Sequence, residues 1–248
     1  QVDYSFALGL NASDWSHNEF LSMTSIDSTN LIPDEYSMLE SRKLNKLKSW
    51  KNFDDFFDNW QRRKNLVFWR GSTTGAIEIK DTSSLIELQR VKLCLQYANN
   101  KDFDLKLTSI VQNHIPKQII RQWLDQRNII GRRVSENIFL KYKYHVDIPG
   151  NNINCGSWGL LRKYLKGNLV FKPNYPSKMS YDHKIKEWHH FVPLEIDFSD
   201  LESQHNWASS NPVKSAKIAW NGYSAAKNYL INIKNYFLES AKQRITKI

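Results

Sequence analysis

Residues 140–172 constrain the fold more than any other part of the sequence. They read as a strand at 142–148, a loop rich in glycine and asparagine at 149–156, a helix from Ser157, and a second strand at 168–172. A strand, a crossover helix and another strand are typical of a protein with a parallel sheet. We therefore expect an α/β fold.

The loop and the start of the expected helix indicate an anion site. Glycines let the backbone approach a ligand, and the free N–H groups of a helix's first turn point at it. Ser157 is the expected N-cap of this helix. Neither G-x-G-x-x-G nor G-x-x-x-x-G-K-[ST] is present. An ordinary strand-to-helix connection is the alternative, and the loop alone does not decide between the two.

The composition excludes several classes of protein. A hydrophobic content of 41% is typical of a globular chain rather than a disordered one. No apolar run approaches the roughly 18 residues of a membrane span. The two cysteines, Cys94 and Cys155, form no C-x-x-C pair, which indicates neither a disulfide framework nor a zinc site. A reducing compartment fits best, although a single bridge stays open.

The net charge of +10 indicates a polyanionic partner without identifying it. Nucleic acid, membrane surfaces and phosphorylated donors all attract a basic protein. The charge is spread along the chain, and no RRM, KH or zinc-finger pattern accompanies it. Charge alone therefore does not choose among these partners.

The remaining elements follow from local patterns. Helices are expected at 37–51, 54–64, 85–97, 116–126, after a cap at Asp197 or Ser199, and at 212–247 with a break near 230–233. Strands are expected at 4–10, 20–26, 66–69 and 187–194, and 105–111 reads as a strand or short helix.

Two side-chain patterns refine these expectations. Phe53, Phe56, Phe57 and Trp60 recur at helical spacing and predict a core face. His189 and His190 lie on the expected strand at 187–194, where neighbouring side chains point to opposite faces, so one should be buried and the other exposed.

Two further polar segments are candidates for the functional site. The turn at 70–75 (RGSTTG) follows a buried strand, and its hydroxyls, amides and Arg70 suit an oxyanion; the alternative is that Arg70 pairs with a structural carboxylate. Asp14 follows the first strand, where open α/β sheets place functional groups, although a helix cap or a solvated turn residue would look the same. The basic stretch 128–133 is a candidate hinge between domains.

Five strings occur together, in order, in one known family. Residues 185–201 resemble L-K-P-W-x-H-Y-x-P-x-x-x-D-L-S-x-L, 68–75 resemble F-R-G-S-x-T-[SG], and 90–93 resemble R-x-x-L. Residues 31–34 resemble I-P-D, and 141–171 resemble K-Y-x-Y, A-S-[FW] and G-S-x-V-[FL]. From about residue 8 to 229 the chain is similar to glycosyltransferase family 90, which includes protein O-glucosyl/xylosyltransferases, capsule-associated transferases and lipopolysaccharide core transferases.

The resemblance implies a GT-B-like α/β fold, with two Rossmann-type lobes, a cleft between them and C-terminal helices. Residues 1–130 would form the acceptor-side lobe, and 131–248 the nucleotide-sugar-binding lobe with the terminal helices. It further implies inverting transfer from a UDP-sugar co-substrate, glucose or xylose, with no metal and no other cofactor.

The partners implied are the nucleotide sugar and a glycan or lipid-linked glycan acceptor, as in lipopolysaccharide core or surface polysaccharide synthesis. No nucleic acid is expected. The expected location is cytoplasmic, with peripheral membrane contact left open, although eukaryotic relatives lie in the endoplasmic reticulum lumen.

Carried over position by position, the resemblance implies Asp14 as the catalytic base. The implied donor-binding residues are Arg70, Gly71, Ser72, Thr73, Thr74, Arg90, Asn154, Gly156, Ser157, Trp158 and Arg162. The family's arginine two residues after the A-S pair falls on Gly159, and Arg162 is the nearest replacement. This departure favours the alternative, a non-catalytic glycan- or nucleic-acid-binding protein derived from a transferase fold.

Overall fold

The computed structural model describes residues 24–25, 31–151 and 154–245. Its centre is a parallel sheet with the strand order β3-β2-β4-β5-β7. The strands are β2 (Lys64–Ser72), β3 (Phe103–Ser109), β4 (Tyr142–Val146), β5 (Leu169–Pro173) and β7 (Val192–Leu194). A separate antiparallel pair joins β1 (Thr24–Ser25) to β6 (Lys178–Met179). The predicted α/β class is confirmed, whereas Asp14 and the expected strand at 4–10 lie outside the described residues.

The order of the strands creates a crevice at one edge of the sheet. β2 is the first of the five strands in the sequence; β3 adds to one side of it, and β4, β5 and β7 extend the other side. In such doubly wound sheets, ligands bind at the carboxyl ends of the strands where the order reverses. Here that point lies beyond β2 and β4. These two neighbours come from either side of residue 130, and the division into domains there stays a prediction.

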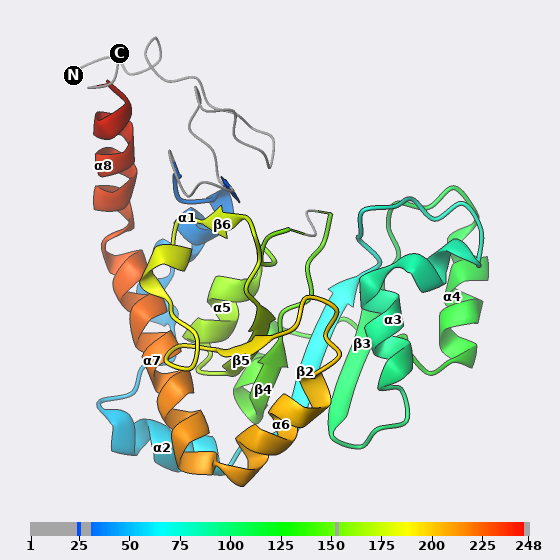
Figure 1. The fold of residues 1–248 in the computed structure, drawn as a ribbon, viewed down its shortest axis with the longest axis horizontal. Coiled ribbons are helices and arrows are strands. Elements are labelled where there is room, and N and C mark those ends of the chain that lie inside the picture. The colour runs from blue at the N-terminus through cyan, green and yellow to red at the C-terminus, as the bar shows by residue number, and fades with distance from the viewer. Residues whose placement is uncertain (1–23, 26–30, 152–153, 246–248) are drawn as a thin grey trace.

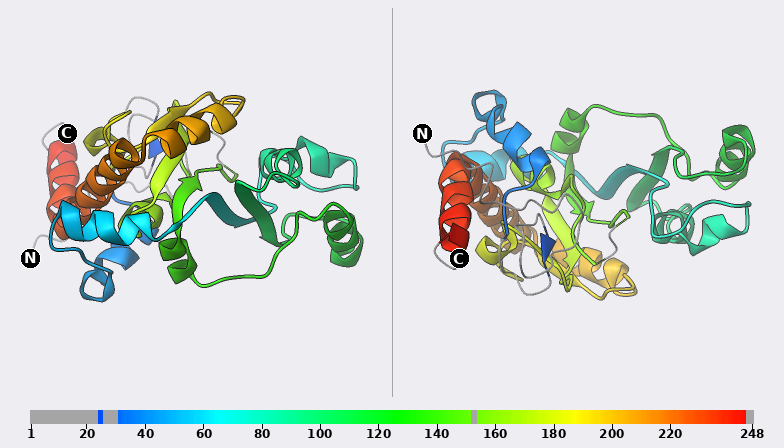
Figure 2. Two further views of the ribbon diagram at one scale, coloured as in Figure 1. Left: turned by 90° about the horizontal axis from the view of Figure 1, so that it is seen from below. Right: turned by 90° about the horizontal axis from the view of Figure 1, so that it is seen from above.

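Helices pack against the sheet and also lie beyond its two edges. They are α1 (Glu35–Ser41), α2 (Phe53–Gln61), α3 (Gln89–Gln96), α4 (Lys117–Gln126), α5 (Leu160–Leu165), α6 (Leu201–Ser210), α7 (Pro212–Ile231) and α8 (Ile233–Ile245). Short 3-10 turns are η2 (Leu44–Lys46), η3 (Ser84–Glu87), η4 (Glu136–Lys141) and η5 (Asp182–Lys184). Figure 1 shows α3 and α4 beyond β3, with α5, α7 and α8 at the other side of the sheet. The views in Figure 2, from below and from above, show the same separation.

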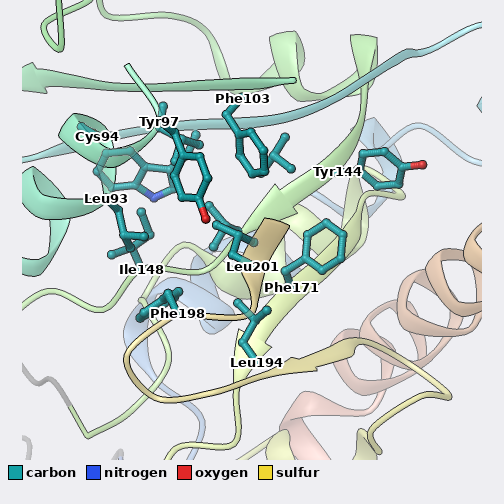
Figure 3. Close-up of a cluster of buried hydrophobic side chains, with 14 of the residues drawn as sticks. Leu93, Cys94, Tyr97, Phe103, Tyr144, Ile148, Phe171, Leu194, Phe198 and Leu201 are labelled. Atoms are coloured by element: carbon teal, nitrogen blue, oxygen red, sulfur yellow. The ribbon is translucent and has the colours of Figure 1, made fainter. Parts of the chain in front are cut away.

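The core lies between the sheet and these helices. Figure 3 shows side chains of α3, β3, β4, β5 and α6 meeting in one cluster, among them Leu93, Phe103, Tyr144 and Phe171. Burial of apolar side chains is the main favourable contribution to folding, and this cluster fixes α3 and α6 against the sheet. The carboxyl ends of the strands are thereby held in place around the crevice.

Two helix predictions are confirmed with their causes. In α2, Phe56 and Trp60 are fully buried, and the Asn52 side chain caps the helix by accepting a hydrogen bond from the Asp55 N–H at 3.0 Å. The C-terminal helical region begins with Pro212, which fits the first turn of a helix, and breaks at Asn232 between α7 and α8.

The helix expected at 37–51 is wrong in both of its ends. It begins earlier, because the Asp34 side chain caps it by accepting from the Ser37 N–H at 2.9 Å. It ends at Ser41, and continuing it would place the like charges of Arg42 and Lys46 one turn apart. Beyond this helix, Trp50 is buried in the core. The helix expected at 85–97 is also interrupted, at Leu88, where η3 gives way to α3.

The strand expected at 187–194 is wrong over most of its length. Only β7, from Val192, is a strand, because Trp188 adopts a left-handed backbone with φ of 56°. His189 and His190 lie in this turn, with ring centroids 4.5 Å apart, and neither is buried. Likewise Asp197 accepts from the Ser199 N–H as a turn residue, and α6 begins later, at Leu201 after Asp200.

Candidate active site

A cavity of about 300 Å³ lies at the crevice beyond β2 and β4. Its walls come from the end of β2, from the loop after β4, from the segment before α5, and from Glu136 at the start of η4. The side chains of Arg70, Arg90, Arg162 and Lys163 line it together with one carboxylate, that of Glu136. Among its lining residues the cavity is therefore strongly cationic.

Arg90 ties the two strand ends together. Its Nε donates to the Pro149 carbonyl at 2.8 Å, and its Nη2 donates to the Ile148 carbonyl at 3.1 Å. Its Nη1 donates to the Ser72 carbonyl at 3.2 Å and to the Thr74 hydroxyl. Burial lowers the pKa of Arg90 to about 10, which leaves the guanidinium charged at neutral pH. Arg90 therefore gives the cavity a positive charge while most of its hydrogen bonds hold the backbone.

Arg70 is tied to a structural carboxylate, as the alternative interpretation expected. Its Nη2 donates to Asp104 Oδ2 at 2.8 Å, and its Nη1 donates to the Asp104 carbonyl at the same distance. The guanidinium lies 4.1 Å from the ring centroid of Phe68. Asp104 on β3 thus holds Arg70 at the edge of the cavity and neutralises part of its charge.

The hydroxyls after β2 have different environments. Thr73 is fully buried, and its Oγ1 donates to the Val111 carbonyl and accepts from the Val111 N–H, both at 2.9 Å. Both hydrogen-bonding functions of that hydroxyl are used within the fold. The Thr74 side chain lines the cavity, and its Oγ1 lies 3.0 Å from the hydroxyl oxygen of Ser72.

The expected helix start at Ser157 is wrong, and the hydroxyl and N–H of Ser157 donate to an internal carboxylate. The Ser157 hydroxyl donates to Asp147 Oδ1 at 2.5 Å, and its N–H points at both carboxylate oxygens at 3.1 and 3.3 Å. α5 begins at Leu160 and has six residues, with Gly159 in the cap position. Asp147 is fully buried, and burial raises its pKa.

A charge cluster closes the side of the cavity next to α5. Lys163 Nζ donates to Glu136 Oε2 at 2.6 Å, and Arg162 Nη1 lies 3.6 Å from Glu136 Oε1. The neighbouring Lys163 and Arg162 lower the pKa of Glu136 despite its burial, which keeps it a carboxylate. Arg162 Nε is buried without a hydrogen-bond partner in the described part of the chain.

Arg162 extends back over Gly159. A Cβ atom at position 159 would lie 3.6 Å from Arg162 Nη2, in ordinary contact. The guanidinium of Arg162 therefore lies beside the position from which a side chain at residue 159 would start.

His145 forms part of the cavity wall from within β4. It is 2% exposed, and its Nδ1 lies 3.1 Å from the Phe68 carbonyl oxygen. Burial, together with the charge of Lys163, lowers its pKa well below the ordinary value, so the imidazole is neutral.

Comparison with known proteins identifies the family. Residues 37–238 match the description "Glycosyl transferase family 90". The chain belongs to glycosyl transferase family 90. Among the relatives of this family 90 chain, protein O-glucosyltransferase 2 of Danio rerio is 24% identical over 172 residues, which cover 69% of this chain and 30% of that protein. Human protein O-glucosyltransferase 3 is 30% identical over 92 residues, 37% of this chain and 18% of that protein. The chain thus spans less than a third of the length of both relatives.

One solved structure that resembles this family 90 chain does so at low similarity. The structure of Anabaena Alr3699/HepE in complex with UDP-glucose aligns with a TM-score of 0.44 and 12% identity. The alignment covers 83% of this chain and 55% of that one.

The structure brings most of the predicted site residues of this family 90 chain to one cavity. Those in its lining are Arg70, Gly71, Thr74, Arg90, Gly156, Ser157, Trp158 and Arg162. Ser72 and Asn154 lie nearby in the same two segments but outside the lining, as does Thr73. The role of each residue in donor binding stays a prediction.

Sequence reasoning missed the charged or titratable residues Glu136, His145 and Lys163 of the cavity lining, and Asp147 beside it. All four are polar or charged yet lie in or beside apolar strand and helix patterns. A charged residue inside a buried strand, such as Asp147 at the end of 142–148, was the available signal, because burial of a charge needs a partner.

Across residues 24–25, 31–151 and 154–245, no group of three or more His, Cys, Asp or Glu side chains is placed to hold a metal ion. In the same part of the chain, no helix combines the length and hydrophobicity needed to cross a bilayer. Cys94 is a free, buried cysteine, so no disulfide joins it to Cys155. Burial raises the pKa of the Cys94 thiol to about 12.

Proposed function

We propose that this chain belongs to an inverting glycosyltransferase that moves a sugar from a UDP-sugar to a glycan hydroxyl. The observation that carries the proposal is the cationic cavity at the carboxyl ends of β2 and β4, in a member of family 90. A diphosphate is recognised by guanidinium, ammonium and N–H donors, which line this cavity. The names of the protein O-glucosyltransferase relatives favour glucose as the sugar, with xylose as the second choice.

In this proposal, Arg162 replaces the family arginine that falls on Gly159. Its Nη2 already lies beside position 159, and its buried Nε has no acceptor within the described residues. An arginine can bind two phosphate oxygens at once, which a lysine cannot. Arg90 adds charge at the other wall. Together they would stabilise the charge that develops on the leaving diphosphate.

The reaction needs a base as well as a stabilised leaving group. The acceptor oxygen attacks the anomeric carbon opposite the diphosphate, the bond from that carbon to the phosphate oxygen breaks, and UDP leaves. A base takes the proton of the acceptor hydroxyl during the attack. Asp14, which lies outside the described residues, is proposed for this role. Because the cavity supplies cationic side chains, the proposal includes no metal and no cofactor besides the UDP-sugar.

The acceptor and location are proposed from the resemblance and from the charge of the chain. The acceptor is a hydroxyl of a glycan or lipid-linked glycan, in a lipopolysaccharide core or a similar surface polysaccharide. The net charge of +10 suits a phosphorylated or membrane-associated acceptor, and a cytoplasmic enzyme in peripheral contact with a membrane fits it.

Isothermal titration with UDP tests the donor site. We expect saturable binding, and no binding at millimolar UDP would contradict the proposal. The Asp14→Asn variant tests the base: transfer should be lost while UDP affinity stays nearly unchanged. Retained turnover in this variant would remove Asp14 from the mechanism.

A non-catalytic binder is the second candidate, and the glycine at position 159 is the observation that favours it. Incubation of a UDP-sugar without acceptor separates the two, because a transferase hydrolyses its donor slowly and a binder does not. Affinity for nucleic acid that falls steeply with salt and ignores UDP would support the binder.

A further inference from the structure

His145 is a polar side chain in an apolar position. Its ring makes an edge contact with Phe139, at 5.3 Å between centroids, and Phe139 in turn packs on Phe68 at 5.1 Å. An aliphatic or aromatic side chain would be compatible with these neighbours and would bury no polar nitrogen. Burying a polar group is unfavourable unless it has a hydrogen-bond partner, so both ring nitrogens need one.

One nitrogen is satisfied within the protein, and this fixes the tautomer. Nδ1 lies 3.1 Å from the Phe68 carbonyl oxygen, and a carbonyl oxygen only accepts hydrogen bonds. Nδ1 therefore carries the proton. Because burial keeps the imidazole neutral, Nε2 carries no proton and presents a lone pair.

The other nitrogen is open to the cavity. Nδ1 makes the hydrogen bond of this ring, and Nε2 makes none to any described residue. His145 lines the cavity, and Nε2 is the ring nitrogen left to face that space. A hydrogen-bond acceptor, held in one orientation by β4 and by the Phe68 carbonyl, thus faces the cavity.

This acceptor differs from the other polar groups of the cavity wall, which are mainly hydrogen-bond donors. Arg90 and Arg162 bring donors, which suit phosphate oxygens. Nε2 of His145 suits the opposite kind of group: a diphosphate has only acceptors at neutral pH, and two acceptors do not bond. What Nε2 can bind is an O–H or N–H group of the ligand.

We infer that His145 is a hydroxyl-binding subsite, in which Nε2 accepts a hydrogen bond from a hydroxyl of the donor's sugar. The inference rests on the proposed function, since it assigns the sugar end of the same site. A UDP-sugar carries hydroxyls on both sides of its diphosphate, on the ribose and on the transferred sugar. The assignment to the sugar is tested by comparison with UDP, which has the ribose alone. His145 is on this view a specificity-determining residue, and it does not act as the base.

Two substitutions at this position separate the two nitrogens. His145→Asn keeps an N–H close to the place of Nδ1, for the Phe68 carbonyl, and removes the acceptor at Nε2. His145→Gln places an amide oxygen near Nε2 and restores the acceptor. His114→Asn is the matched control, because His114 is exposed and pairs with Glu78 on the surface. Isothermal titration compares UDP, UDP-glucose and UDP-xylose for all four proteins.

The wild type should bind at least one of the two UDP-sugars more tightly than UDP. His145→Asn should weaken that UDP-sugar about tenfold and leave UDP within about twofold, since one hydrogen bond contributes roughly that factor. His145→Gln should recover most of the loss, and His114→Asn should match the wild type.

The failures are distinguishable. If the wild type binds no UDP, the proposed function fails and this inference with it. If UDP binds but no UDP-sugar exceeds it, or if His145→Asn weakens UDP and UDP-sugar equally or neither, the inference alone is overturned.

Discussion

The hydroxyl of Ser157 lies 2.5 Å from Oδ1 of Asp147 and closes the glycine-rich loop after β4 at its base. The buried carboxylate of Asp147 joins the two ends of the loop. The backbone carbonyl of Asp147 accepts a hydrogen bond from the Tyr175 hydroxyl at 3.0 Å. Arg90 holds the next two carbonyls, those of Ile148 and Pro149. The loop base is therefore fixed by buried polar contacts, and the cavity wall next to it is fixed as well.

Ser157→Ala should destabilise the fold in a pH-dependent way. Burial raises the pKa of Asp147 above its ordinary value of 3.8, and the Ser157 hydrogen bonds oppose this rise. Without the hydroxyl, the buried carboxylate loses a hydrogen-bond donor, a contact worth about 1.5–3 kcal/mol, and the pKa of Asp147 rises further. The loss of stability in Ser157→Ala should be full at pH values above the pKa of Asp147 in both folded proteins, the wild type and the variant. It should shrink as the pH falls through these two pKa values, because protonation removes the buried charge.

Urea unfolding of wild type and Ser157→Ala at pH 7 and at pH 4.5 measures this difference. Ser210→Ala, at an exposed position on α6, is the control and should change little at either pH. An equal loss at both pH values would contradict a role for the Asp147 charge.

Arg90→Lys should be destabilising although it conserves the charge. The guanidinium makes hydrogen bonds to carbonyls on both strand ends, and a lysine ammonium cannot contact them together. We expect a loss of about 3 kcal/mol in the free energy of unfolding and weaker UDP binding. Arg121→Lys, on the exposed side of α4, should unfold and bind like the wild type. Denaturant titration and calorimetry check both parts, and a wild-type midpoint for Arg90→Lys would show that the loop is held by other contacts.

Arg162→Ala should weaken UDP binding by about tenfold or more, because charge-assisted hydrogen bonds to phosphate are strong. The decisive variant is the double substitution Gly159→Arg with Arg162→Ala, which moves the guanidinium to the family's usual position. Since position 159 faces the same space, the double variant should recover much of the affinity.

Arg62→Ala, exposed at the end of α2, is the control for Arg162→Ala. All these affinities are compared by titration with UDP. If Arg162→Ala binds UDP as well as the wild type does, Arg162 does not replace the family arginine.

Gly71→Ala should be destabilising, whereas Gly159→Ala should be tolerated. A Cβ atom at residue 71 would overlap the Trp69 ring, and relief of that overlap in a packed region costs about 1–3 kcal/mol. At residue 159 a Cβ would make only an ordinary contact with Arg162, so a loss below about 1 kcal/mol is expected for this cap position. Thermal unfolding compares the two, and similar melting temperatures would contradict the packing argument.

Local sequence patterns predicted the elements that local physics controls. The buried runs at 66–69, 142–148 and 168–172 correspond to β2, β4 and β5, and the aromatic spacing in α2 placed Phe56 in the core. They failed where a distant contact overrides propensity, as in the region after Ser41, where Trp50 packs on Tyr223 of α7 at 4.8 Å between ring centroids.

The sequence by itself determined the family, the parallel α/β class and the two polar segments of the site. Those depend on residue type and spacing along the chain. Only the tertiary structure decided the partners of the polar groups. The carboxylates of Asp104, Asp147 and Glu136 accept hydrogen bonds from Arg70, Ser157 and Lys163, respectively. These partners lie on different strands or turns, and strand order in the sheet sets which of them meet. For the same reason the open nitrogen of His145, between the strands and the cavity, has no signature in the sequence.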